Sequence, residues 1–235
     1  MKTNAESYLA LSELGSRISP YAPTHDLPGN FINPSHEYFS TCPTGGMGIA
    51  VCIDTGIAGY LQRADALKIY ELAYFSDGDV LELGTHKGLS TSIIALALHD
   101  RGGPPRTLET VDIDGDASGE AQTTLTSQPG RQFIHFNVGD AAQFMDLMIA
   151  QRREFGFIFI DHWHGYEATR LAALRVDALL KPGGFVLFHD YNDPANADPA
   201  HVYGVWSAVD DIIAKQYRYE FFGNFGCCGL FRKAP

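Results

Sequence analysis

Two short stretches of the sequence place acidic and imidazole side chains directly after apolar runs. One reads Ile160-Asp161-His162-Trp163-His164, and the other reads Phe188-His189-Asp190. If the apolar runs are successive strands of one sheet, Asp161 and Asp190 converge at its edge. Two carboxylates beside an imidazole favour Mg²⁺ or a related divalent ion. Such an ion lowers the pKa of a hydroxyl group that binds it, so the spacing predicts a site that activates a hydroxyl.

His164 is the candidate general base of this site, because an imidazole titrates near neutral pH. The predicted metal ligands are Asp161, His189 and Asp190. Each choice has a structural alternative. His162 and His189 could be hydrogen-bonded structural histidines, and the two carboxylates could cap helices or face solvent in loops.

A second informative segment joins an apolar run to a glycine-bearing turn and a helix start. It reads Val80-Leu81-Glu82-Leu83-Gly84-Thr85-His86-Lys87-Gly88-Leu89-Ser90-Thr91. Glycines let the backbone approach a ligand closely, and the free amides and Ser90 at the helix start can hold a carboxylate. Only Gly84 and Gly88 are present, so the G-x-G-x-x-G dinucleotide pattern is absent. The segment predicts a ligand-binding turn, with a purely structural strand-to-helix turn as the alternative.

Acidic residues also follow the next two apolar runs. Asp112 ends one run, where a carboxylate can accept both hydroxyl hydrogens of a ribose. In the alternative interpretation the acids here cap the following helix, a role open to Asp114 and Asp116. Asp140, in Gly139-Asp140-Ala141, could accept from an exocyclic amine or cap its own helix.

The elements that must position these residues alternate between buried strands and helices. This alternation predicts right-handed crossovers and a parallel sheet covered on both faces. The expected strands are 80–83, 108–113, 133–136, 157–160 and 185–188, and the expected helices are 64–74, 90–98, 117–127, 141–151, 166–180 and 205–215, with a terminal hairpin from 219 to 232.

The first part of the chain has a different character. Residues 1–57 contain several prolines and a Gly45-Gly46 pair, which predicts an irregular cap or lid. Residues 58–235 form the predicted main domain.

Composition narrows the classes of partner. The net charge of -11 comes from only 19% charged residues and includes no basic run, which argues against nucleic acid. The first 20 residues contain no long apolar stretch, so we expect no membrane span and a cytoplasmic location. The spacings of Cys42, Cys52, Cys227 and Cys228 fit neither a zinc ribbon nor a disulfide framework. Buried free thiols are expected, and the adjacent pair in a strand would point to opposite faces.

The order of these parts resembles the class I S-adenosylmethionine-dependent methyltransferases. The shared features are E-x-G-x-x-x-G-x-S, an acid closing the second strand and G-D-A closing the third. The resemblance implies an α/β, Rossmann-like, doubly wound and mostly parallel seven-stranded sheet with an antiparallel C-terminal hairpin and an N-terminal cap. It implies S-adenosylmethionine as cofactor, with the methionine end at Gly84, Gly88 and Ser90. The full set of implied cofactor contacts is Glu82, Gly84, Thr85, His86, Gly88, Ser90, Asp112 (ribose), Asp140 and Ala141 (adenine), and Asp161.

The chemistry site resembles two groups within this class. The macrocin-type small-molecule O-methyltransferases (methyltransferase family 24) match residues 160–167 and 188–191, whereas the catechol-type enzymes match Asp161-His162-Trp163. Both imply metal ligands at Asp161 and Asp190 and a polar, basic residue at His164. The two groups differ in the third metal ligand. The macrocin-type pattern has an acid at the position of His189, whereas the catechol-type pattern has an asparagine at the position of Tyr191.

These observations predict an enzyme that methylates an oxygen of a small hydroxylated metabolite, such as a sugar, a phenol or another natural-product intermediate. Asp161 and His164 are its expected catalytic residues, and Mg²⁺ or another divalent metal assists. The alternatives are an N- or C-methyltransferase or cyclase with the same cofactor, and a non-catalytic methyltransferase-like binding module. The expected partner is a small-molecule substrate. We expect the protein to bind neither nucleic acid nor a membrane, and the sequence leaves open whether it forms a homodimer.

Overall fold

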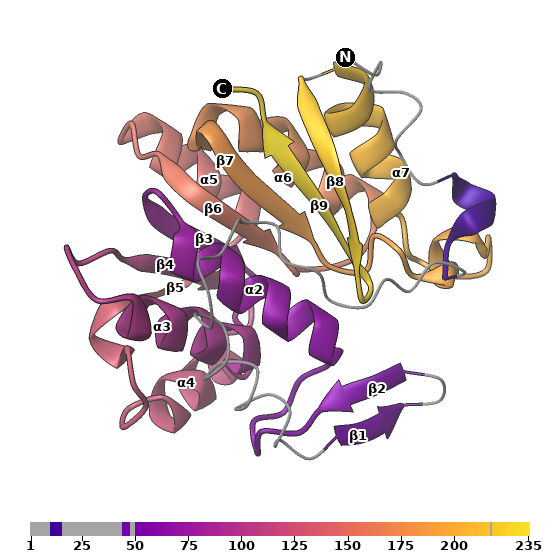
Figure 1. Ribbon diagram of the computed structural model, residues 1–235. Helices are drawn as coiled ribbons and strands as arrows, with labels where there is room; N and C mark the ends of the chain where they lie inside the picture. Colours follow the sequence, from indigo (N-terminus) through magenta and orange to yellow (C-terminus); the bar gives the residue numbers. More distant parts are fainter. Residues whose placement is uncertain (1–9, 16–43, 48–49, 217) are drawn as a thin grey trace, which may run out of the picture.

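A seven-stranded sheet forms the centre of the protein, in the order β5-β4-β3-β6-β7-β9-β8. The computed structural model describes residues 10–15, 44–47, 50–216 and 218–235 (Figure 1). The five parallel strands are β3 (Asp79–Leu83), β4 (Leu108–Asp112), β5 (Ile134–Val138), β6 (Phe155–Ile160) and β7 (Leu180–Phe188). The last two strands, β8 (Tyr219–Phe225) and β9 (Cys228–Lys233), form a hairpin whose β9 pairs antiparallel with β7.

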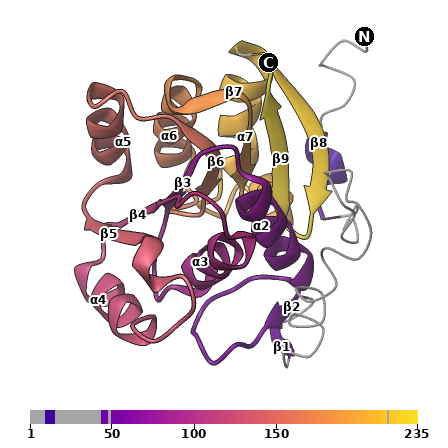
Figure 2. The same ribbon diagram turned by 60° about the vertical axis from the view of Figure 1, so that its left-hand side comes forward.

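Helices cover both faces of the sheet (Figure 2). They are α2 (Arg63–Phe75), α3 (Leu89–Arg101), α4 (Gly115–Thr124), α5 (Ala141–Ala150), α6 (Tyr166–Leu179) and α7 (Val205–Val209), the last continuing into a π-helical segment (Asp210–Ala214). One buried cluster joins α2 and α3 to the sheet, and a second joins α5, α6 and α7 to its other face. The expected doubly wound α/β class with its antiparallel hairpin is confirmed.

The central strand β6 shows why the sheet is parallel and enclosed. All six of its residues, Phe155-Gly156-Phe157-Ile158-Phe159-Ile160, are buried. A strand apolar on both faces is stable only when helices cover both faces. Strand order runs from β3 to β4 and β5 on one side, and from β3 to β6 and β7 on the other. Such a reversal leaves a crevice at the carboxyl ends of the strands, between β3 and β6.

The structure departs from the sequence expectations at several boundaries. Residues 44–53 form an antiparallel hairpin of β1 (Thr44–Met47) and β2 (Ala50–Ile53), where no regular structure was expected. Most of the rest of the expected cap, 1–9 and 16–43, lies outside the described residues. In the terminal hairpin, β8 continues through Gly223 and Asn224, and the turn consists of Gly226 and Cys227. β7 begins earlier than expected, and its register against β6 shifts between Phe155 and Phe157. Among the described helices, none is long and apolar enough to cross a membrane.

Candidate active site

A cavity of about 810 Å³ lies at the carboxyl ends of the parallel strands. Its wall includes Gly84 after β3, Asp112 at the end of β4, Asp161 after β6 and Asp190 after β7. The stretch 58–62, which leads into α2, adds a further side. This volume is in the usual range for small-molecule sites. The expected convergence of successive strand ends is therefore observed.

The turn after β3 can only be built with glycine at position 84. Gly84 has a φ of 103°, and a Cβ there would lie 2.1 Å from the carbonyl oxygen of Asp161. The backbone of β3 thus passes directly against the start of the loop that carries Asp161. Gly88, with a φ of 92°, is the N-cap residue of α3. The turn leaves Thr85, His86 and Ser90 on the cavity wall.

Glu82 lies beneath this turn and is fully buried. Its carboxylate accepts hydrogen bonds from Ser90 at 2.5 Å, Thr91 at 2.6 Å and Thr110 at 2.7 Å. Burial raises the pKa of Glu82 to about 7, although the three hydroxyl donors oppose the shift. Glu82 therefore holds the first turn of α3 and the side chain of Ser90 in place from below the cavity. Its expected direct contact with a cofactor stays a prediction.

Asp112 is aimed at the cavity by two backbone amides. Its carboxylate accepts from the N–H of His86 at 2.6 Å and from the N–H of Asp114 at 2.9 Å. A carboxylate has about four acceptor positions, so two remain for a ligand. The residue that caps the following helix is Asp114, whose carboxylate accepts from the amides of Asp116 and Ala117. Next to Asp112, Ile113 also lines the cavity and is 78% exposed.

Asp140 has the structural role that the sequence left open. It is the N-cap of α5, and its carboxylate accepts from the amide of Gln143 at 2.9 Å. Its neighbours Gly139 and Ala141 line the cavity. The predicted contact between Asp140 and an exocyclic amine stays a prediction.

At the other end of the cavity, two histidines meet the two carboxylates. His189 Nδ1 lies 3.0 Å from Asp161 Oδ1 and 3.4 Å from Asp190 Oδ1, and His164 Nδ1 lies 3.1 Å from Asp190 Oδ2. Asp190 has a φ of 54°, a left-handed conformation that is rare outside glycine and recurs at functional sites. The four residues singled out from the sequence are thus within contact distance of one another.

Charge within this group shifts two pKa values in opposite directions. Burial alone would lower the pKa of His189, but Asp161, Cys227 and Asp190 raise it well above its usual value. Burial alone would raise the pKa of Asp190, but the charges of His189 and His164 hold it well below its ordinary range. Both shifts favour the charged forms of the two side chains.

Aromatic side chains surround His164. Its ring lies 5.0 Å from the ring of Tyr203, between centroids, and its carbonyl oxygen accepts from the amide of Gly204. Burial, followed by the charge of Asp190, raises the pKa of Tyr203 to about 12. Trp163 lines the cavity and is 66% exposed. His162 Nδ1 lies 2.9 Å from the carbonyl oxygen of Trp163, and its buried Nε2 has no hydrogen-bond partner among the described residues.

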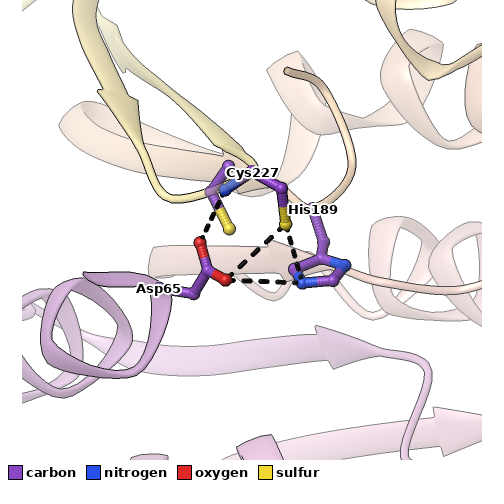
Figure 3. A group of neighbouring side chains, drawn as sticks. Asp65, His189 and Cys227 are labelled. Atoms are coloured by element: carbon purple, nitrogen blue, oxygen red, sulfur yellow. Dashed lines mark hydrogen bonds and ion pairs between the residues drawn. The ribbon is translucent and has the colours of Figure 1, made fainter. Parts of the chain in front are cut away.

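The opposite nitrogen of His189 faces a second group of donors (Figure 3). His189 Nε2 lies 3.2 Å from Cys227 Sγ and 3.9 Å from Asp65 Oδ2. Cys227 lies in the turn before β9 and not within a strand, so its thiol and that of Cys228 face the same group, contrary to expectation. Cys228 is a buried free cysteine, as predicted, whereas Cys227 is only partly buried. Cys42 and Cys52 lie outside the described side chains.

Sequence reasoning missed several residues of this cavity. Asp65, Cys227, Tyr203 and Ile113 all line it. Only Ile113 carried a signal, because an apolar residue directly after the acid at a strand end has no reason to be exposed unless a ligand covers it. The other three come from segments distant in the sequence.

Comparisons with known proteins identify the type of domain. Residues 81–191 match the family described as a methyltransferase domain. No curated protein matches the chain by sequence. The O-methyltransferase TomG from Streptomyces achromogenes, involved in tomaymycin synthesis and solved with S-adenosylmethionine, superposes with a TM-score of 0.62 at 16% identity, over 90% of this chain and 92% of that one.

Two further structures widen the comparison. The O-methyltransferase from Bacillus cereus, in complex with S-adenosylhomocysteine, gives a TM-score of 0.61 at 13% identity, with 89% and 94% of the chains covered. The N-methyltransferase NodS from Bradyrhizobium japonicum WM9 gives 0.50 at 18% identity, with 72% and 94% covered. At these identities the likeness shows the fold, and the fold is shared by enzymes that methylate different atoms.

Proposed function

We propose, from the match of residues 81–191 to a methyltransferase domain and from the shared fold, that the protein is an enzyme that methylates an oxygen atom of a small hydroxylated molecule. The observation that carries the proposal is the continuity of the cavity. One wall holds Asp112 and the turn after β3, and the other holds Asp161, His164 and Asp190. A methyl donor and an acceptor can therefore lie side by side in one cavity.

The turn after β3 and the end of β4 would hold S-adenosylmethionine. The free acceptor positions of Asp112 fit the two hydroxyls of a ribose, and the exposed face of Ile113 fits an apolar ring. Residues Thr85, His86 and Ser90 lie where the methionine end is expected, at the start of α3. When bound, the cofactor supplies a methyl group on a positively charged sulfur.

His164 would remove the proton of the acceptor hydroxyl. Asp190 Oδ2, 3.1 Å from His164 Nδ1, favours the tautomer with the proton on Nδ1, which leaves Nε2 as the basic nitrogen. After proton transfer, the same carboxylate stabilises the imidazolium. Tyr203 packs against the ring and restricts its orientation. Asp190 is therefore a positioning residue for the base, and the aromatic walls limit the access of water.

A divalent ion would be held by Asp161, His189 and Asp190. The side chain of His189 is 6% exposed, and its Nδ1 has no well-directed hydrogen bond although two carboxylate oxygens lie 3.0 and 3.4 Å away. An orphaned nitrogen between two carboxylates fits a cation. When bound, the ion would lower the pKa of the acceptor hydroxyl and orient it.

The segment before residue 58 is proposed as the cover of this cavity. Residues 58–62 already line it, and Tyr60 is 62% exposed there. A cover over a bound acceptor would exclude water from the reaction.

Cofactor binding tests the first half of the proposal. Calorimetric titration of the metal-stripped protein with S-adenosylmethionine, with and without Mg²⁺, should give one saturable site. Asp112→Ala removes a charged acceptor of two hydroxyl hydrogens and should weaken binding by about tenfold or more, since such bonds contribute about 1.5–3 kcal/mol. Asp116→Ala is the matched control, because Asp116 is exposed and lies in the first turn of α4. No binding by folded wild-type protein would contradict the proposal.

Turnover tests the second half. A panel of phenols and sugars is incubated with methyl-labelled cofactor, and product mass and fragmentation identify the methylated atom. With an accepted substrate, His164→Ala should lower kcat by about 10²–10⁴-fold while leaving cofactor affinity unchanged, as expected for loss of a general base. His99→Ala, an exposed histidine near the end of α3, is the control. Unchanged turnover in His164→Ala removes this residue as the base, and full activity in EDTA removes the metal.

A further inference from the structure

The strongest feature outside the proposed reaction is the group formed by Asp65, His189, Cys227 and Cys228 (Figure 3). These residues come from the first turn of α2, the end of β7 and the turn between β8 and β9. One donor atom from each lies within 4.8 Å of every other. Carboxylate, imidazole and two thiols are a donor set that suits zinc and differs from the oxygen ligands preferred by Mg²⁺.

Three separations within this group are close to those required around one tetrahedral ion. Bond lengths of about 2.3 Å to sulfur and about 2.0–2.1 Å to nitrogen and oxygen place ligand atoms about 3.3–3.8 Å apart. In the structure, Cys227 Sγ lies 3.2 Å from His189 Nε2 and 3.6 Å from Asp65 Oδ2, and the last two atoms lie 3.9 Å apart. Small side-chain movements are enough to reach the ideal values.

The surroundings of the group already fix its members. Asp65 accepts from the amides of Gln62 at 2.8 Å and Cys227 at 3.0 Å, so its carboxylate is oriented before any ion arrives. On the far side of the imidazole, His189 Nδ1 lies 3.0 Å from the carboxylate of Asp161. A carboxylate behind a histidine in this way is a recurrent feature of zinc sites, where it sets the tautomer of the ligand.

Burial adds a reason for a cation to bind here. Asp65 has no exposed surface, and within the described part of the chain no lysine or arginine pairs with it. A buried carboxylate is stabilised either by a proton or by a nearby positive charge. His189 can supply one charge, but a divalent ion would supply two and would also engage both thiols.

We propose that Asp65, His189 Nε2, Cys227 and Cys228 form a metal site for a thiophilic divalent ion of the zinc class, separate from the carboxylate pair of the reaction site. The ion would join α2, β7 and the C-terminal hairpin at one wall of the cavity. Because a neutral imidazole has a single lone pair, an ion on Nε2 leaves the proton on Nδ1. His189 then turns a protonated Nδ1 toward Asp161 and Asp190. With zinc bound, the ion of the reaction site would therefore rest on these two carboxylates, without His189 as its third ligand.

The test uses reduced, metal-stripped, full-length protein and Co²⁺ as the probe, without cofactor or acceptor. Co²⁺ should bind at one ion per chain and give a near-ultraviolet thiolate charge-transfer band and intense visible bands typical of tetrahedral sites. One equivalent of Zn²⁺ should remove these bands, and an excess of Mg²⁺ should not. In parallel, one equivalent of Zn²⁺ should raise Tm.

Matched variants assign the bands. The Cys227→Ser/Cys228→Ser protein should lose the charge-transfer band and bind Zn²⁺ at least about 100-fold more weakly, whereas Cys42→Ser/Cys52→Ser, with the same number of thiols removed, should keep both properties. Asp65→Asn, which keeps the side-chain shape and an acceptor for one of the two amides, should weaken Zn²⁺ binding, and circular dichroism checks that the variant is folded. Absence of the band in folded wild-type protein overturns the site, as does its persistence in Cys227→Ser/Cys228→Ser.

The readout is independent of methyl transfer. A protein that turns over an acceptor but gives no thiolate band contradicts only the metal site. One that gives the band but neither binds S-adenosylmethionine nor transfers a methyl group contradicts only the proposed function.

Discussion

The buried carboxylate of Glu82 should make the stability of this protein fall as the pH rises through neutrality. Burial raises its pKa to about 7 in the folded protein, against an ordinary value of 4.5 for an exposed glutamate. The folded protein therefore holds a proton that the unfolded chain releases between these two values. Stability is complete below the lower value and declines as pH approaches and passes the upper one.

The size of this effect follows from the two pKa values. A difference of about 2.5 pKa units corresponds to about 3.5 kcal/mol, at about 1.4 kcal/mol per unit. Linkage places about 2 kcal/mol of this loss between about pH 5.5 and pH 8.5. Glu82→Gln has no proton to lose and keeps an amide that can bond to Ser90, Thr91 and Thr110.

Urea unfolding at a series of pH values measures the effect. The free energy of unfolding of the wild type should fall by about 2 kcal/mol more than that of Glu82→Gln across this range. Glu120→Gln, at an exposed position of α4, controls for the chemical change. The comparison cancels the contributions of the ionisable groups that all three proteins share. Parallel curves for wild type and Glu82→Gln would refute the assignment of the shift to Glu82.

Two further predictions concern the stability of the fold around the site. Gly84→Ala should destabilise the protein by at least about 2 kcal/mol, because the new Cβ meets the carbonyl oxygen of Asp161 in a left-handed backbone conformation; urea unfolding checks this, and wild-type stability would contradict the close approach. Lys68→Met should cost about 3 kcal/mol, because it removes the ammonium group 2.6 Å from the fully buried Glu71 carboxylate. Thermal unfolding measures the stability of Lys68→Met and of Lys68→Met/Glu71→Leu. The double variant should recover most of the stability that Lys68→Met loses.

Much of the fold was predictable because its signals are local. Buried apolar runs such as 157–160, separated by stretches of helical spacing, can only form a parallel sheet covered on both faces. Strand ends were predicted within a few residues, apart from β7, whose start at Leu180 lies within Leu180-Lys181-Pro182-Gly183-Gly184. The hairpin at 44–53 was not predicted, since Gly45 and Gly46 indicate a turn when taken alone.

The sequence also predicted which acidic residues meet at the proposed active site. Asp112, Asp161 and Asp190 follow strands of one parallel sheet, and parallel strands bring their carboxyl ends to one edge. Sequence alone could not decide between capping and binding. The structure assigns helix capping to Asp114 and Asp140, because their carboxylates meet the amides of their own helices, and it shows Glu82 below the cavity wall.

Only the tertiary structure revealed the group around Asp65 and His189. Its donors come from positions 65, 189, 227 and 228, so no spacing rule of the kind that identifies zinc ribbons applies to it. Sequence periodicity specified the elements, since burial on each face depends on the local pattern of apolar residues. The contact between the turn at Cys227, the first turn of α2 and the end of β7 depends on how three separate elements pack, and no local pattern encodes that distance.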